Sequence, residues 1–120
     1  MTERYETAKQ RAAGILYVRN RVAGELDALR AVAARLHEEA CRAVRRGDER
    51  AARAFLAQKE ERLARVACVE ADLDVLRADA ETAKAGLAAA FEATRAHERA
   101  RLRARATELV IAGEVEAETS

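Results

Sequence analysis

The sequence predicts an all-α protein, a long antiparallel two-helix coiled-coil hairpin whose second helix overhangs the first. The 120 residues are rich in alanine, arginine, glutamate and leucine, which are strong helix formers, and they include no proline. Apolar residues recur at alternating steps of three and four, which is the period of a coiled coil. A glycine-aspartate pair at residues 47–48 divides this pattern into two runs that match when the chain folds back.

The first helix is expected over residues 3–46. Its apolar pattern is interrupted only at Arg19. Gly14 and Gly24 lie inside the pattern, where a glycine costs about 1 kcal/mol relative to alanine without breaking a long helix. The apolar contact positions between the two helices are called the seam, and in the first helix they are Ile15, Val22, Leu26, Leu29 and Leu36.

The tip of the hairpin is expected at Gly47 and Asp48. Arg45 and Arg46 suit the end of a helix, because cations there interact favourably with the helix dipole. Glycine commonly follows the last helical residue, and aspartate is a good cap for the start of the next helix. Glu49 then lies in the first turn of the second helix, where the dipole favours an anion.

The second helix is expected over residues 49–112, followed by an acidic, flexible tail over residues 113–120. The glycine at position 113 marks the predicted boundary, because glycine often ends a helix. The seam of the second helix consists of Phe55, Val66, Val69, Leu73, Leu76 and Leu87.

The two seams align when residues whose numbers add to about 95 face each other. Leu26 then faces Val69, and Leu29 faces Val66. One turn position that brings both seams into register is stronger evidence than either seam alone. A three-helix bundle broken near Gly86 is the alternative, but it requires a turn in a stretch without proline or paired glycines.

Residues from Thr94 onward are expected to overhang the first helix without a partner in their own chain. They combine five arginines with four large aliphatic residues. These are Arg95, Arg99, Arg101, Arg103 and Arg105 with Leu102, Leu109, Val110 and Ile111. Exposed aliphatic residues in a row are rarely left uncovered on a soluble protein. This stretch is therefore the expected contact surface, for a second copy in a homo-oligomer or for an anionic membrane, and self-association is favoured.

The sequence offers little for catalysis, and we expect no enzymatic activity, no cofactor and no metal. It contains no glycine-rich phosphate loop and no nucleophile or zinc-protease motif. A two-helix coiled coil also has no concave pocket in which to desolvate a substrate. His37 and Cys41 have the spacing of half a zinc site, but the other half is missing. Cys41 and Cys68 are too far apart in the predicted register for an intrachain disulfide.

The net charge of +1 gives no argument for nucleic-acid binding. The first ten residues contain no apolar signal core, and the longest uncharged stretches are too short to cross a membrane. Two cysteines do not make a disulfide framework. These features predict a cytoplasmic protein with reduced thiols, whose basic overhang is compatible with peripheral contact at the inner membrane.

The stretch around the predicted tip has an alanine-rich helix end and a turn with glycine and an acidic residue. An Ala-Arg pair, an aliphatic residue and a lysine follow. The positions are Ala43, Gly47, Glu49, Ala52, Arg53, Leu56 and Lys59, with Leu73, Leu76, Lys84 and Leu87 downstream. This pattern resembles the phage shock protein A family of the ESCRT-III superfamily, over about residues 10–112. The chain looks like a truncated relative that covers mainly the helical hairpin.

The resemblance implies a bacterial, non-enzymatic scaffold that self-associates at the inner face of the membrane. Family members polymerise into rods or rings and remodel or protect bilayers under stress. Some also restrain an AAA+ transcriptional activator, so a protein regulator is an implied partner. The function expected from the resemblance is membrane stress response, membrane remodelling or its regulation. A helical-hairpin binding module or chaperone of a secretion or rotary machine is the alternative.

Overall fold

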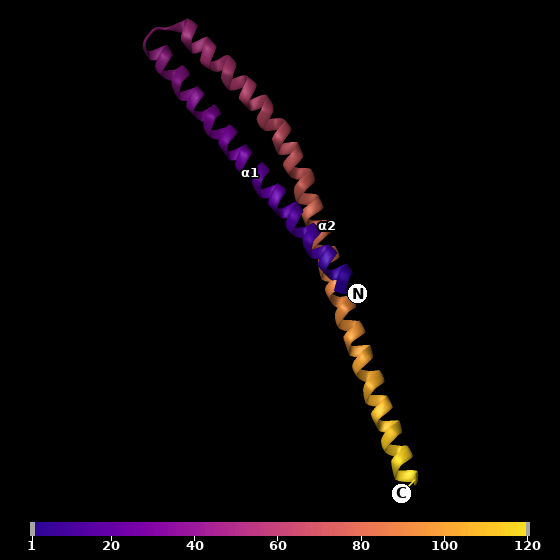
Figure 1. Cartoon of the computed structure of the whole chain (residues 1–120). Helices are drawn as coiled ribbons and strands as arrows, with labels where there is room; N and C mark the ends of the chain where they lie inside the picture. The colour runs from indigo at the N-terminus through magenta and orange to yellow at the C-terminus, as the bar shows by residue number, and fades with distance from the viewer. Residues whose placement is uncertain (1, 120) are drawn as a thin grey trace. The chain divides into compact units, whose positions relative to one another are not determined.

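The computed structural model describes the backbone of residues 2–119 and the side chains of residues 3–114. Helix α1 spans Thr2–Arg45 and helix α2 spans Glu49–Thr119, and a short turn joins them (Figure 1). The described residues contain no strand. The predicted all-α two-helix hairpin is therefore confirmed, and α2 runs unbroken through Gly86, where the alternative placed a turn.

The chain divides into two compact units, and each helix contributes to both. The tip unit is Ala13–Thr82, which contains the turn. The terminal unit combines the residues up to Ala12 with the residues from Ala83 onward. Each unit has its own contacts between α1 and α2, and the two are described separately.

The turn at the tip is fixed by a glycine in the left-handed conformation. Gly47 has a φ of 78°, which an L-residue rarely adopts. Its N–H donates to the carbonyl of Val44 at 3.0 Å, and the N–H of Asp48 donates to the carbonyl of Ala43 at 2.9 Å. These two bonds form the Schellman motif, which satisfies carbonyls at the end of α1. Asp48 in turn caps α2, because its Oδ1 accepts from the N–H of Ala51 at 3.1 Å.

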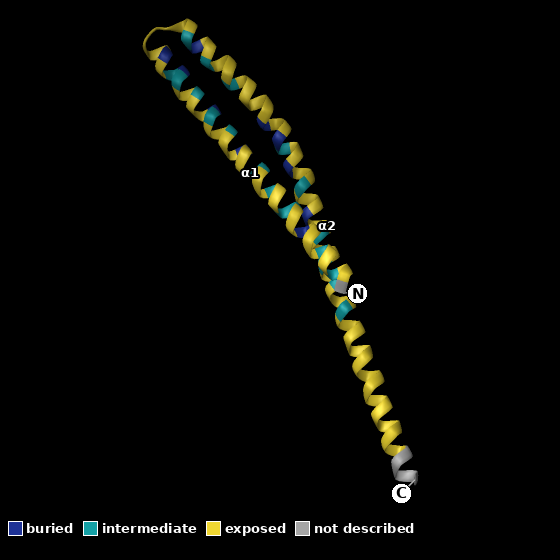
Figure 2. Ribbon diagram, in the orientation of Figure 1, coloured by how far each residue is buried: buried dark blue, intermediate teal, exposed yellow. Residues whose placement is uncertain are grey.

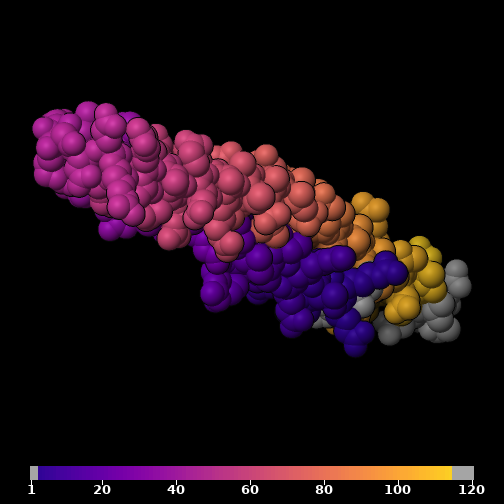
Figure 3. Space-filling view, turned by 90° about the horizontal axis from the view of Figure 1, so that it is seen from above, coloured from indigo at the N-terminus to yellow at the C-terminus, as the bar shows by residue number. Residues whose placement is uncertain are grey.

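The tip unit is closed by an apolar seam with two zones. Large aliphatic residues form the core cluster, which consists of Leu26, Val66, Val69 and Leu73, with Val22, Ala23 and Leu29 packed against it. The buried residues nearer the turn are all alanines, namely Ala33, Ala40, Ala43 and Ala52. Small side chains permit a shorter distance between helix axes. On the face shown in Figure 3, the side chains around the tip form a closed surface.

Two polar contacts join the helices of the tip unit and report their register. Nζ of Lys59 lies 3.1 Å from Nδ1 of His37, a pair that lies within one residue of the predicted alignment. Arg30 donates to Glu70 at 2.6 Å, and the length of both side chains allows this contact to run diagonally. The helices are therefore antiparallel in nearly the register that the seams predicted.

In the terminal unit, the first residues of α1 pack against α2. The rings of Tyr5 and Phe91 lie 6.0 Å apart and are tilted by 52°. The predicted register placed Tyr5 opposite Ala90, so the observed contact again differs by one residue. Thr94 is the last half-buried residue of α2 among those whose side chains the structure describes, and its hydroxyl donates to the carbonyl of Ala90 at 3.0 Å.

The end of α2 was predicted wrongly. The sequence placed it at Ala112, before a tail over residues 113–120, whereas the helix continues to Thr119. Gly113 lies inside it because one helical glycine costs only about 1 kcal/mol relative to alanine and no proline follows. Among the described residues, only Gly47 has the positive φ of a glycine that ends a helix. The flexibility of the tail stays a prediction, and Ser120 lies outside the described residues.

Candidate interaction surface

A stretch of α2 in the terminal unit has no cover from the described part of the chain. Every residue from Arg95 to Glu114 is exposed, whereas the preceding turns of α2 keep one half-buried side (Figure 2). We call residues 95–114 the exposed segment. Since packing of an apolar face usually provides most of a helix's stability, a helical stretch of this length without such packing is unusual.

The exposed segment contains four large aliphatic residues at high exposure. Leu102 and Leu109 are each 66% exposed, and Val110 and Ile111 are 60% and 54% exposed. They do not form one stripe. With 3.6 residues per turn, Leu102 and Leu109 lie on one side, and Ile111, nine residues after Leu102, faces the opposite way. The sequence grouped these residues as one surface, but the helix divides them between two sides.

The five arginines of the exposed segment are all exposed. Arg95 pairs with Glu98 at 3.3 Å, with both side chains 54% exposed. Arg99, Arg101, Arg103 and Arg105 form no ion pair within the described part of the chain. Unpaired guanidinium groups on an exposed helix are available to carboxylates or phosphates of a partner.

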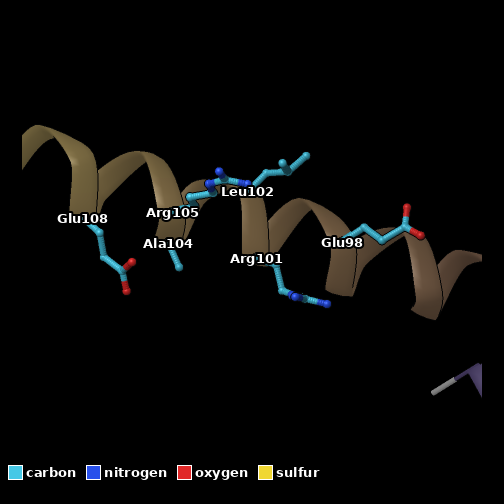
Figure 4. A pocket seen from close by; sticks show the side chains of 6 residues that line it. All are labelled: Glu98, Arg101, Leu102, Ala104, Arg105 and Glu108. Atoms are coloured by element: carbon cyan, nitrogen blue, oxygen red, sulfur yellow. The ribbon is translucent and has the colours of Figure 1, made fainter.

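A shallow depression runs along the exposed segment. It is lined by Glu98, Arg101, Leu102, Ala104, Arg105 and Glu108. Figure 4 shows Leu102 and Arg105 on one side of the helix and Arg101, Ala104 and Glu108 on the other. Because all the lining residues belong to a single helix, the depression encloses nothing, and it is suited to docking another helix or a flat surface.

The predicted seam lies where the two helices meet. Leu26, Val66, Val69 and Leu73 are buried, and the other seam residues are half-buried, namely Ile15, Val22, Leu29, Leu36, Phe55, Leu76 and Leu87. Sequence reasoning missed Leu16 and Val32, which are also half-buried. Each lies directly beside a predicted apolar position, so a wider seam of adjacent apolar pairs was the signal that could have found them.

One cysteine and one histidine of the chain, Cys41 and His37, lie in contact, whereas Cys68 and His97 lie elsewhere on α2. Sγ of Cys41 lies 3.7 Å from Nε2 of His37, and the lysine ammonium of Lys59 donates to Nδ1 of the same ring. An ammonium group can only donate, so Nδ1 is the acceptor in this contact, and Nε2 is the ring nitrogen nearer the sulfur. Cys41 is half-buried and Cys68 is exposed, and both are free thiols. The described residues contain no group of three side chains able to hold a metal ion.

The fold and the exposed segment define the class of protein, an all-α helical hairpin with an uncovered helical stretch. Comparison with known family models, with curated proteins and with solved structures found no match to this chain. Neither helix, over its described residues, is long and apolar enough to cross a membrane.

Proposed function

We propose that this chain is a non-enzymatic coiled-coil scaffold that self-associates through the exposed segment. The observation that carries the proposal is a helical stretch, residues 95–114, with four exposed large aliphatic residues and no cover. Exposed large apolar side chains on an uncovered helix favour a protein contact. A second copy of the chain is always present at the same concentration, which makes it the simplest partner.

The setting we propose is the membrane stress response or its regulation. It rests on the resemblance of the tip to the phage shock protein A family, with Gly47, Glu49, Arg53 and Lys59 among the matching positions. The arginines of the exposed segment support peripheral contact with anionic lipids at the inner membrane. Basic residues near such a surface each contribute about 1 kcal/mol of attraction.

Self-association is tested by sedimentation velocity of the full chain. We expect oligomers from the natural sequence and smaller species from the double variant Leu102→Ser and Leu109→Ser, because serine removes the apolar contacts. The matched control is Val44→Ser with Val75→Ser, since these valines are equally exposed but lie in the tip unit. A monodisperse monomer at all concentrations would contradict the proposal and favour a hairpin binding module or chaperone of a secretion or rotary machine.

The membrane setting is tested by pelleting with liposomes that contain anionic phospholipid. Replacing Arg99, Arg101 and Arg103 by glutamine is expected to weaken pelleting, with the larger effect at low salt where charges are less screened. Liposomes of neutral phospholipid serve as the control. Equal pelleting of the natural sequence and the triple variant with anionic liposomes would contradict the proposed lipid contact. The proposed self-association would not be affected, because sedimentation velocity tests it separately.

A further inference from the structure

Four residues of the exposed segment form one stripe along α2. Glu98, Leu102, Arg105 and Leu109 follow one another at steps of four, three and four, which places them on the same side of a helix. All four are exposed. The stripe alternates charged and aliphatic residues, with leucines at the second and fourth positions.

The stripe lies next to the side of α2 that meets α1 in the preceding turns. The seam residues Leu87 and Thr94 continue at the seven-residue repeat to Arg101 and Glu108. Leu102 is one residue further along, which turns it by about 100° around the helix. In Figure 4, Leu102 and Arg105 stand along one edge of the helix and Arg101 and Glu108 along the other. Arg105 is turned from Arg101 by only about 40°, since residues four apart share a side of the helix. No described residue of α1 covers the stripe, because every residue from Arg95 to Glu114 is exposed, so this part of α2 is open to a second helix.

The charges of the stripe are opposite on the two sides of Leu102. Glu98 precedes Leu102 by four residues, and Arg105 follows it by three. Two parallel copies in register would place Glu98 against Glu98 and Arg105 against Arg105, which is repulsive. Two antiparallel copies related by a two-fold axis near Leu102 would instead place Glu98 against Arg105 twice. Among arrangements that place the two Leu102 side chains together, the stripe is thus self-complementary only when the copies are antiparallel.

We propose that a second copy of this chain binds the stripe in antiparallel orientation, with the two Leu102 side chains adjacent at the two-fold axis. The inference rests on the proposed self-association and adds its partner, orientation and register. Arg105 has no intrachain ion pair within the described residues and is free to reach the second copy. The carboxylate of Glu98 accepts from Arg95, and it has further lone pairs for Arg105 of the second copy.

Charge reversal tests the pairing. Glu98→Arg alone and Arg105→Glu alone each convert two attractive contacts into two repulsive ones. Each is expected to raise the dissociation constant of the dimer roughly tenfold or more. The double variant restores opposite charges and is expected to return within about threefold of the natural sequence. An equimolar mixture of the two single variants is expected to associate better than either variant by itself, because each supplies the missing charge.

Matched controls separate pairing from net charge. Arg62→Glu changes the net charge as Arg105→Glu does, and Glu60→Arg changes it as Glu98→Arg does, yet both residues are exposed and lie in the tip unit. The controls are expected to stay within about twofold of the natural sequence. Equal effects of the control and stripe variants on the dissociation constant, or no rescue in the double variant, would overturn the antiparallel pairing. The proposed self-association would still hold if the natural sequence forms oligomers. A natural sequence that stays monomeric would remove both.

The orientation has a separate readout. Spin labels at Ala112→Cys, with Cys41 and Cys68 replaced by alanine, lie ten residues from the proposed axis in each copy. At ~1.5 Å per residue the two labels are expected roughly 30 Å apart along the axis. A parallel pair would hold them near the distance between packed helix axes, about 10 Å. A short distance between the labels would overturn the antiparallel arrangement.

Discussion

The tip unit and the exposed segment contain the same kinds of residue, yet only the tip unit encloses an apolar interior. In the tip unit, aliphatic residues recur at coiled-coil spacing on both helices, and four of them are buried together. In the exposed segment, Leu102 and Leu109 keep that spacing but Ile111 points the other way, and no described residue of α1 lies opposite. Burial in this chain therefore depends on spacing and on an opposing helix rather than on apolar content.

The tip unit and the exposed segment also differ in what their contacts stabilise. The tip unit has a complete capping arrangement, a closed seam and no buried polar side chain among its described residues. These features stabilise the hairpin without requiring any partner. The exposed segment has unpaired arginines and uncovered leucines, which stabilise nothing within the chain. Substitutions in the tip unit are accordingly expected to affect folding, and those in the exposed segment to affect the self-association that we propose.

The largest expected difference concerns two leucines. Leu73 is 2% exposed and lies in the core cluster, so Leu73→Ala is expected to lower the free energy of unfolding by about 3 kcal/mol. Leu109→Ala removes the same atoms from an exposed position and is expected to change the free energy of unfolding by less than about 0.5 kcal/mol. Urea unfolding followed by circular dichroism measures both. Similar losses would mean that the exposed segment is covered in solution, for example by a second copy.

A smaller difference concerns two glycines. Gly47→Ala places a side chain at a φ of 78° and is expected to cost about 1–2 kcal/mol of stability. Gly113→Ala is expected to favour the local helix by up to about 1 kcal/mol, because that glycine lies within α2. Apart from adjacent residues and the backbone of its own helix, neither added methyl group meets an atom within 4 Å, so the backbone conformation decides both effects.

The two glycine variants need different measurements. Global unfolding in urea reports Gly47→Ala, because the turn joins the two helices of the tip unit. Amide hydrogen exchange in the last turns of α2 reports Gly113→Ala, because local opening there does not require the hairpin to unfold. A loss of helix in the Gly113→Ala variant would indicate that α2 ends near residue 113 in solution, as the sequence first suggested.

Sequence reasoning reached the hairpin because its signals were local and redundant. The Gly47-Asp48 pair matches both the end of one helix and the cap of the next, and the apolar spacing independently fixed the register to within one residue. Sequence reasoning missed the end of α2, which it placed before Gly113. A glycine in helix-favouring surroundings ends a helix only when further contacts hold it at positive φ.

The candidate surface was predicted only in outline. The count of arginines and aliphatic residues after Thr94 identified an uncovered stretch, and every residue from Arg95 to Glu114 is exposed. The division of Leu102 and Ile111 between two sides follows from the helical angle, which a list of residues does not express. Within the described residues nothing covers the stretch, and the cover that we propose for it is a second molecule.

The smallest expected difference concerns two ion pairs of nearly equal exposure. Arg30 and Glu70 join the two helices at 2.6 Å, whereas Arg95 and Glu98 lie on one helix at 3.3 Å. A double-mutant cycle to alanine is expected to give a coupling energy of about 0.5 kcal/mol for the first pair in global unfolding, and about zero for the second. Unfolding separates Arg30 from Glu70 by opening the hairpin, while the second pair reports only on local helix. Added salt should reduce the first coupling, since both side chains are in contact with water. Equal couplings for the two pairs would mean that the exposed segment unfolds together with the tip unit, which would break the comparison.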